Sequence, residues 1–164
     1  MKCLNYLEHK LRAYDIYDFL GNVYAIIHFS NLIDELSRAM FHTGLEHFGR
    51  GDFFHCINTI VFQIERILRA LCEKIGILNL FHDEKKEHPK GLEYMIPKLK
   101  EHNVLSDKIL FFIEWLLSGS SEIIPENIRN KIAHGISDVD HFKRIYTRYN
   151  ALSIILIYLS LSKL

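Results

Sequence analysis

The sequence predicts a single all-α domain over residues 1–164, an up-and-down bundle of about five to seven helices. Apolar residues recur every three or four positions along most of the chain, which is the spacing of one helix face. Only three prolines and eight glycines interrupt that spacing, so long helices are favoured over many short strands. A length of 164 residues with 49% hydrophobic content is enough for one core and too short for two independent ones.

The first half of the chain contains three expected helices. The first ends near Gly21 and carries Leu4, Leu7, Leu11 and Tyr14. The second begins after Ser30, ends at the break over residues 48–51, and carries Leu32, Leu36, Met40 and Leu45. The third lies between an N-cap at Asp52 and a stop at Gly76, and its apolar face comprises Phe53, Ile57, Ile60, Ile64, Leu68, Leu71 and Ile75. We expect this helix, roughly six turns long, to form the backbone of the core.

The second half consists of shorter elements. Residues 79–91 are charged and contain a proline and a glycine, which indicates a surface loop. Helices are expected at 92–101, interrupted or kinked by Pro97, and at 107–117 behind the cap Ser106. After a loop from residue 118, Pro125 suits the first turn of a short helix that carries residues 126–134 and ends at Gly135. A final helix, capped by Asp138 or Asp140, carries Ile145, Tyr149, Leu152 and Leu156.

Composition excludes several classes of protein. Twenty basic and twenty acidic residues give a net charge of zero, which argues against a protein that coats nucleic acid through many phosphate contacts. The three cysteines form no CxxC pair and no zinc-ligand pattern, so neither a disulfide framework nor a metal site is expected. Residues 1–15 lack the apolar core of a signal peptide, and the apolar run 151–161 is too short to cross a bilayer. We expect a cytoplasmic protein without membrane contact, in which this run lies in the core or at a protomer interface.

The segment RNKIAHG, residues 129–135, carries the side chains best suited to chemistry. On a helix Asn130 and His134 share a face, whereas Arg129 and His134 are about 140° apart. The guanidinium of Arg129 and the imidazole of His134 can therefore reach one anion only because the arginine side chain is long and the backbone of Gly135 can leave the helix beside His134. Arginine stays protonated and binds phosphate, and histidine moves a proton near neutral pH, so the pair suffices without a metal for attack of a ribose 2′-hydroxyl on its phosphate. The alternative is a surface helix whose histidine packs beside a glycine cap.

Two further groups of charged residues are candidates. Glu65 and Arg69 have the spacing of an intrahelical ion pair, but their helix is apolar over most of its circumference, so Glu65 is expected to be partly buried beside the site and to hold Arg129. Residues 126–164 contain six basic and three acidic residues. We expect part of this surplus to line an RNA path, the alternative being a solvated helix face; the residues are Lys131, Lys143, Arg144 and Arg148.

The Arg-x4-His spacing late in an all-α chain resembles the HEPN superfamily, many members of which are metal-independent ribonucleases. The fuller string RNKIAHG resembles the RNxxxHG motif of an uncharacterised HEPN-like family. Residues 51–69, followed by Gly76, are similar to the long helix of that family with its Gln-Ile-Glu-x-x-Leu-Arg core. The resemblance covers about residues 40–160, with both motifs in the expected order.

The resemblance implies a homodimer in which two such motifs face each other across a cleft and cleave RNA to 2′,3′-cyclic phosphate ends. The net charge of zero favours a short, single-stranded RNA segment as the substrate. It implies that His134 is the general acid or base, that Arg129 stabilises the scissile phosphate, and that Asn130 positions one of them. No cofactor and no metal is expected. The implied roles are a toxin, a phage-defence effector or an RNA-processing module, partnered by an antitoxin or by a fused or associated regulatory protein.

Two other functions stay open at this point. One is a non-catalytic dimerisation module that binds RNA or protein, with RNKIAHG as a structural turn. The other is a nucleotide-binding partner of a nucleotidyltransferase.

Overall fold

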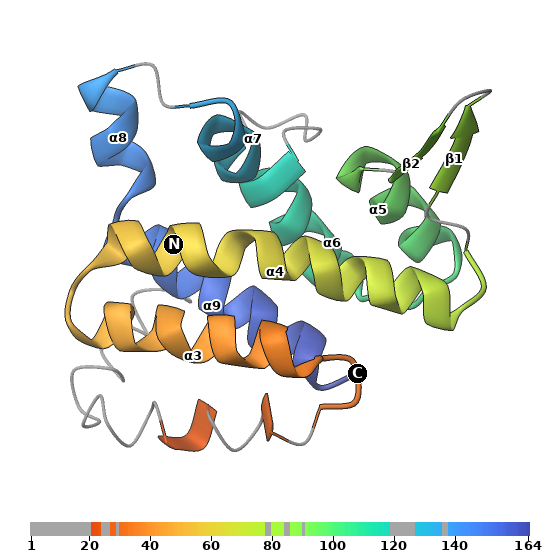
Figure 1. The fold of residues 1–164 in the computed structure, drawn as a ribbon, viewed down its shortest axis with the longest axis horizontal. Coiled ribbons are helices and arrows are strands. Elements are labelled where there is room, and N and C mark those ends of the chain that lie inside the picture. Colours follow the sequence, from red (N-terminus) through yellow and green to blue (C-terminus); the bar gives the residue numbers. More distant parts are fainter. Residues whose placement is uncertain are drawn as a thin grey trace.

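The computed structural model describes residues 21–23, 27–28, 30–77, 80–83, 86–89, 91–118, 127–135 and 138–164. Its elements in chain order are α3 (Glu35–Gly49), α4 (Phe53–Lys74), β1 (Leu80–Asp83), β2 (Lys86–Pro89), α5 (Leu92–Glu101), α6 (Asp107–Ile113), the π turn η1 (Glu114–Ser118), α7 (Ile128–Ala133), α8 (Val139–Ile145) and α9 (Arg148–Ser162). The helices form one bundle, which confirms the all-α, single-domain fold (Figure 1). The expected first helix lies almost entirely outside the described residues.

The central helix of the bundle is α4, which packs against α3 and α9 (Figure 1). Asp52 caps it by accepting a hydrogen bond from the backbone N–H of His55, and Gly76 follows its end with a φ of +78°. Both limits agree with the prediction. The residues that α4 buries are Cys56, Ile57, Ile60, Val61, Ile64, Ile67, Leu68, Leu71 and Cys72.

The C-terminal helix α9 is buried on nearly all sides within the chain, so the apolar run 151–161 belongs to the core of a single protomer. Its Tyr158 is fully buried, stacks on Phe41 with ring centroids 3.9 Å apart, and donates a hydrogen bond to the carbonyl oxygen of Ser37 at 3.2 Å. These contacts join α9 to α3. None of the described helices has both the length and the hydropathy that spanning a membrane requires.

The predicted start of the second helix, directly after Ser30, is wrong. The helix begins at Glu35, because Asp34 caps it by accepting the backbone N–H of Ser37. Of the apolar residues that the spacing placed on this helix, Leu45 is fully buried and Leu36 is 57% exposed. The residues that α3 buries against α4 and α9 are Ser37, Phe41, Gly44, Leu45 and Phe48.

Two elements in the second half also differ from the prediction. Residues 79–91 are not a plain loop, because β1 and β2 pair as an antiparallel hairpin with Leu80 opposite Pro89. Their charges indicate a surface position but contain no information on backbone pairing. In α5 the chain continues as helix through Pro97, an exposed residue of that helix that cannot donate a backbone hydrogen bond.

The expected final helix is two helices, α8 and α9. Asp138 caps the first, as one of the two predicted caps, and Thr147 caps the second by accepting the backbone N–H of Asn150. The side chain of Asn150 donates to the carbonyl oxygens of Arg144 and Ile145 at 3.0 Å. The buried amide of Asn150 thus provides hydrogen bonds to two carbonyl oxygens at the end of α8. The apolar spacing across residues 145–156 did not indicate this break between α8 and α9.

Candidate functional site

The short helix α7 carries the Arg-x4-His motif. Its N-cap Asn127 has a φ of +47°, in the left-handed region that asparagine tolerates better than most residues. Ile128 is fully buried and anchors α7, which packs on η1 and α4. His134 is the C-cap, and Gly135 follows with a φ of +84°, so the backbone leaves the helix directly after the histidine.

Arg129 is held by Glu65 of α4. The Nε and Nη2 atoms of Arg129 lie 3.0 and 2.8 Å from Oε2 of Glu65, and Nη2 of Arg69 lies 3.0 Å from Oε1. Both expected contacts of Glu65 are therefore present at once. The side chains are 15% exposed for Glu65, 28% for Arg129 and 24% for Arg69, so solvent screens these charges less than it screens an open surface pair.

Asn130 completes the attachment of Arg129. Its Oδ1 accepts a hydrogen bond from Nη1 of Arg129 at 2.7 Å. A guanidinium has five N–H groups, and within the described part of the chain these contacts engage three of them, which leaves two for another acceptor. The guanidinium groups of Arg129 and Arg69 share the one carboxylate of Glu65. The cluster is thus chemically suited to bind one oxyanion, such as a phosphate.

His134 is exposed at the end of the same helix. Its backbone N–H donates to the carbonyl oxygen of Asn130 at 2.9 Å, and the N–H of Gly135 donates to that of Ile132 at 3.3 Å. Among the described residues, no hydrogen bond or ion pair joins the imidazole to Arg129. One protomer therefore presents an anchored arginine and an exposed histidine on different faces of one short helix.

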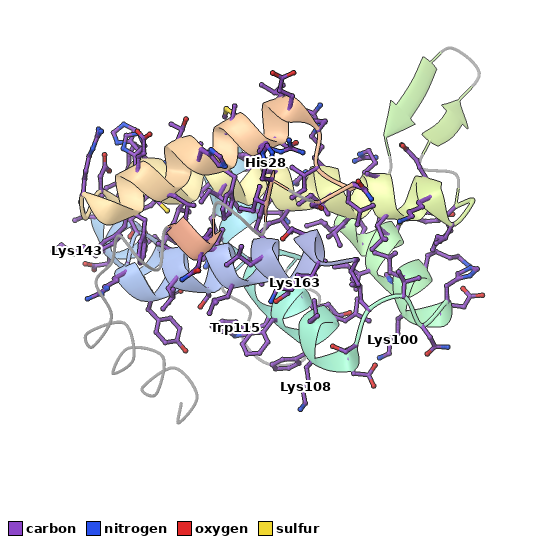
Figure 2. All side chains as sticks on the ribbon, turned by 90° about the horizontal axis from the view of Figure 1, so that it is seen from below. His28, Lys100, Lys108, Trp115, Lys143 and Lys163 are labelled. Atoms are coloured by element: carbon purple, nitrogen blue, oxygen red, sulfur yellow. The ribbon has the colours of Figure 1, made fainter. Side chains whose placement is uncertain are left out.

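The four residues expected to line an RNA path lie on different helices. Lys131 is on α7, Lys143 and Arg144 are exposed on α8, and Arg148 begins α9. Lys143 lies at the opposite end of the molecule from Lys100 (Figure 2). The structure therefore places only Lys131 on the same helix as Arg129 and His134.

An exposed aromatic cluster beside α8 is a feature that the sequence analysis missed. Phe54 of α4, Phe142 of α8 and Tyr146 lie with their ring centroids 4.7–5.8 Å apart. Phe54 and Phe142 are 40% and 43% exposed. The spacing of Phe142 and Tyr146 is a helical signal that could have been noticed, but Phe54 comes from a distant part of the chain. Exposed rings near lysine and arginine are the elements with which proteins bind single-stranded nucleic acid.

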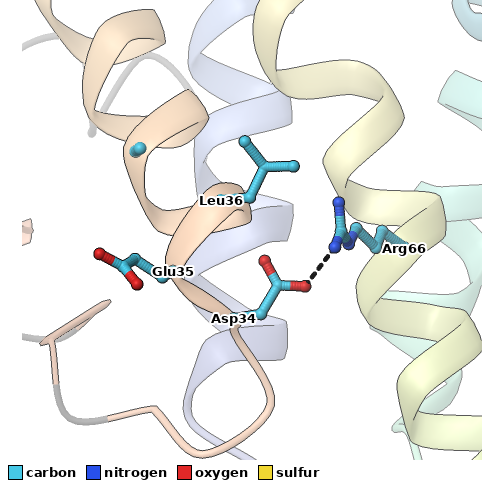
Figure 3. Close-up of a pocket in the computed structure, with 5 residues that line it drawn as sticks. Asp34, Glu35, Leu36 and Arg66 are labelled. Carbon is cyan, nitrogen blue, oxygen red and sulfur yellow. Dashed lines mark ion pairs between the residues drawn. The ribbon is translucent and has the colours of Figure 1, made fainter.

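An open pocket lies between the start of α3 and α4 (Figure 3). Its lining includes Asp34, Leu36 and Arg66, and the carboxylate of Asp34 pairs with Arg66 at 2.6 Å. The backbone N–H of Ser37, which bonds the same carboxylate, holds the pKa of Asp34 below its usual value. No lining residue belongs to α7, so this pocket is not part of the Arg129 cluster.

A second group that the sequence analysis missed lies at the turn between α3 and α4. His47, Asp52 and His55 come together there, although their spacing matches no recognised ligand pattern. Only the geometry of the turn makes them neighbours.

Comparisons of the chain with protein-family models, with curated proteins and with solved structures found no match. The resemblance to the HEPN superfamily therefore depends on the two sequence motifs, and the site is interpreted from its own geometry.

Proposed function

We propose that this protein is a metal-independent endoribonuclease of the HEPN type that works as a homodimer through Arg129, Asn130 and His134. The observation that carries the proposal is the fixation of Arg129 by Glu65 and Asn130, which leaves two of its N–H groups without an acceptor among the described residues. An arginine that only stabilised the fold would not need an exposed histidine on the same helix. An arginine that stabilises a phosphate in a transition state does need a nearby group that moves protons.

The proposed reaction uses the RNA itself as nucleophile. The ribose 2′-oxygen attacks the adjacent phosphorus as its proton passes to one His134, and the bond from phosphorus to the 5′-oxygen breaks. The 5′-oxygen takes up a proton, which leaves a 2′,3′-cyclic phosphate and a 5′-hydroxyl. The leftover N–H groups of Arg129 stabilise the charge that develops on the phosphoryl oxygens.

A dimer is proposed because one protomer does not bring the two functional heads together. Arg129 and His134 lie about 140° apart around α7, and the guanidinium is turned toward α4 by Glu65. Two copies that bring their α7 helices face to face supply two histidines, one to accept a proton and one to return it. Both are then within reach of the arginine of either copy.

The preferred substrate is single-stranded RNA. A net charge of zero leaves little capacity for binding along a duplex by phosphate contacts alone. Unpaired bases can instead stack on the exposed rings of Phe54 and Phe142, while Lys143 and Arg144 contact phosphates. The Lys131 side chain adds positive charge on α7 itself.

RNA cleavage by matched variants tests the proposal. Wild type, Arg129→Ala, His134→Ala and His141→Ala are incubated with mixed single-stranded RNA in the presence of EDTA. His141→Ala removes a histidine from α8 and controls for general effects. We expect wild type and His141→Ala to cleave equally, and the other two to lose at least about a hundredfold in rate. Equal cleavage by all four proteins contradicts the proposal.

A non-catalytic binding module is the second candidate function. It is favoured by the fact that Nε and Nη2 of Arg129 already contact Glu65 and so hold α7 on α4, which is a structural role. In that case His134→Ala has no effect on RNA integrity or on growth of an expressing bacterium. Toxicity that disappears with His134→Ala supports the nuclease and its role as a toxin or defence effector.

A further inference from the structure

The turn between α3 and α4 gathers two histidines and an aspartate from two helices. We propose that Nδ1 of His47, Oδ2 of Asp52 and Nδ1 of His55 bind a divalent transition-metal ion of the zinc class. Nδ1 of His47 lies 3.0 Å from Oδ2 of Asp52, and Nδ1 of His55 lies 2.6 Å from the same oxygen. One ligand atom from each of the three residues lies within 4.8 Å of the other two.

The backbone of the turn builds this arrangement. Helix α3 ends in a Schellman motif, in which the N–H of Asp52 bonds the carbonyl oxygen of His47 at 2.9 Å and the N–H of Gly51 bonds that of Phe48 at 3.0 Å. Gly51 has the positive φ, +76°, that this motif requires. Asp52 is at the same time the N-cap of α4, and its Oδ1 accepts the N–H of His55 at 3.1 Å. Thus one aspartate is adjacent to the last turn of α3 and the first turn of α4.

Other Schellman motifs of the chain show that a polar pair at these positions is unusual. At the end of α4 the equivalent residues are Cys72 and Ile77, and at the end of α5 they are Leu99 and Val104. Those residues are apolar and pack in or against the core, which is the usual contact in this motif. Only at the end of α3, among these three, is the apolar pair replaced by a histidine and an aspartate. Helix termination therefore does not explain His47.

The need for a helix cap does not explain the histidine at position 47 either. Asp138 and His141 at the start of α8 repeat the pair formed by Asp52 and His55, with the aspartate accepting both the N–H and the Nδ1 of the histidine. At each of these two helix starts the capping aspartate thus also contacts the ring of a histidine on its own helix. His47 is an additional histidine, supplied by the preceding helix to the oxygen that already contacts His55.

The donor set specifies the class of ion. Two imidazole nitrogens and one carboxylate oxygen suit zinc and its neighbours, whereas magnesium and calcium prefer oxygen alone. The cap bond from His55 N–H to Oδ1 fixes the carboxylate so that Oδ2 faces the two rings, as supporting hydrogen bonds do in metal sites. Phe54 packs edge-on against the ring of His55 at 5.0 Å and limits its rotation. Solvent completes the coordination, because the site is only partly buried.

The proposed site is independent of the proposed ribonuclease. His55 and Glu65 are ten residues apart on α4, which corresponds to about 15 Å along the helix axis. Bound metal is therefore expected to join the end of α3 to the start of α4 and to stabilise the folded chain, without contributing to RNA cleavage.

Calorimetric titration of chelator-treated full chain with zinc chloride tests the inference. We expect one ion to bind wild type with a dissociation constant in the micromolar range, together with a rise in the melting temperature. His47→Ala, His55→Ala and Asp52→Asn are expected to weaken binding at least about tenfold. Asp52→Asn keeps an oxygen for the cap of α4, so its effect separates loss of the ligand from loss of the helix cap.

His141→Ala is the matched control, because it removes a histidine from the same kind of cap at the start of α8. It should bind zinc like wild type, and this difference matters in a chain with ten histidines. Circular dichroism establishes that each variant is folded, and His47→Gln replaces His47→Ala if the latter is not. The inference is overturned if wild type does not bind zinc, or if the His47 and His55 variants bind zinc with the same affinity as wild type.

Discussion

Replacing Glu65 with glutamine removes the charge that holds Arg129 and Arg69 while leaving the shape of the side chain. Oε2 accepts from two nitrogens of Arg129 at 3.0 and 2.8 Å, and Oε1 accepts from Arg69 at 3.0 Å. After the substitution two partly shielded guanidinium groups face each other without a carboxylate between them. We expect the folded state to be destabilised and α7 to be held less firmly on α4.

The magnitude follows from the burial of the three side chains. Exposed ion pairs contribute about 0–1 kcal/mol, and breaking a fully buried pair costs about 3–5 kcal/mol. Exposed fractions of 15% for Glu65, 28% for Arg129 and 24% for Arg69 place this cluster between the two, at about 2 kcal/mol. For a chain of this length that corresponds to a fall in melting temperature of about 4–8 °C.

Urea unfolding of a double-mutant cycle measures the effect. The cycle comprises wild type, Glu65→Gln, Arg129→Gln and the double variant, and we expect a coupling free energy of about 1 kcal/mol. Arg66→Gln is the control, since Arg66 forms a shorter contact with Asp34, at 2.6 Å, but both side chains are about half exposed. It should cost less than about 1 kcal/mol. A coupling near zero, or a larger loss for Arg66→Gln than for Glu65→Gln, refutes the reasoning.

Three further predictions concern the core. Gly44→Ala places a methyl group against the side chain of Ile60. Crowding is expected to destabilise the folded state by about 2 kcal/mol and the higher helix propensity of alanine to stabilise it by about 1 kcal/mol, so urea unfolding should show a net loss of about 1 kcal/mol. Tyr158→Phe removes the buried hydrogen bond to Ser37 and costs about 1 kcal/mol by the same measurement. Burial raises the pKa of the Cys56 thiol to about 12 from an ordinary 9.0, so above about pH 9 the unfolded chain loses a proton that the folded chain keeps. The contribution of this thiol to the free energy of unfolding is therefore constant below about pH 9 and falls by up to about 1.4 kcal/mol per pH unit above it. Cys56→Ala is expected to remove this contribution to the pH slope between about pH 9 and 10. Unchanged unfolding midpoints in the first two variants, or equal pH slopes in the third, contradict the packing described.

The helix ends that could be predicted are those determined by residues close together in the sequence. Asp52 and Gly76 bound α4, and Ser106 caps α6, because a cap forms between residues two to four positions apart. The break at Thr147 has the same kind of local signal, but the apolar spacing continues across it and obscured it. Leu36 shows the converse limit, since the exposed side of α3 is decided by where α4 and α9 lie.

The contacts of the candidate site that could be predicted are those of a charged residue that needs an oppositely charged partner when it is buried. A carboxylate on a mostly apolar helix needs a cation, and the contact of Glu65 with Arg129 is present. The contact of Phe54 with Phe142 was not predictable, because neither ring requires the other. His47 and Asp52 meet through a Schellman turn whose side-chain consequences are visible only in three dimensions. The catalytic role of His134 stays a prediction, because it depends on a second copy of the chain.

The chemistry of RNA ends tests the central claim most directly. Mass spectrometry of the products of a defined single-stranded RNA, cleaved in EDTA, distinguishes the possible reactions. The proposed mechanism predicts 2′,3′-cyclic phosphate and 5′-hydroxyl ends that form with wild type and His141→Ala and disappear with His134→Ala. Intact RNA with wild type, 3′-hydroxyl ends, or cyclic phosphate that persists in His134→Ala would contradict it.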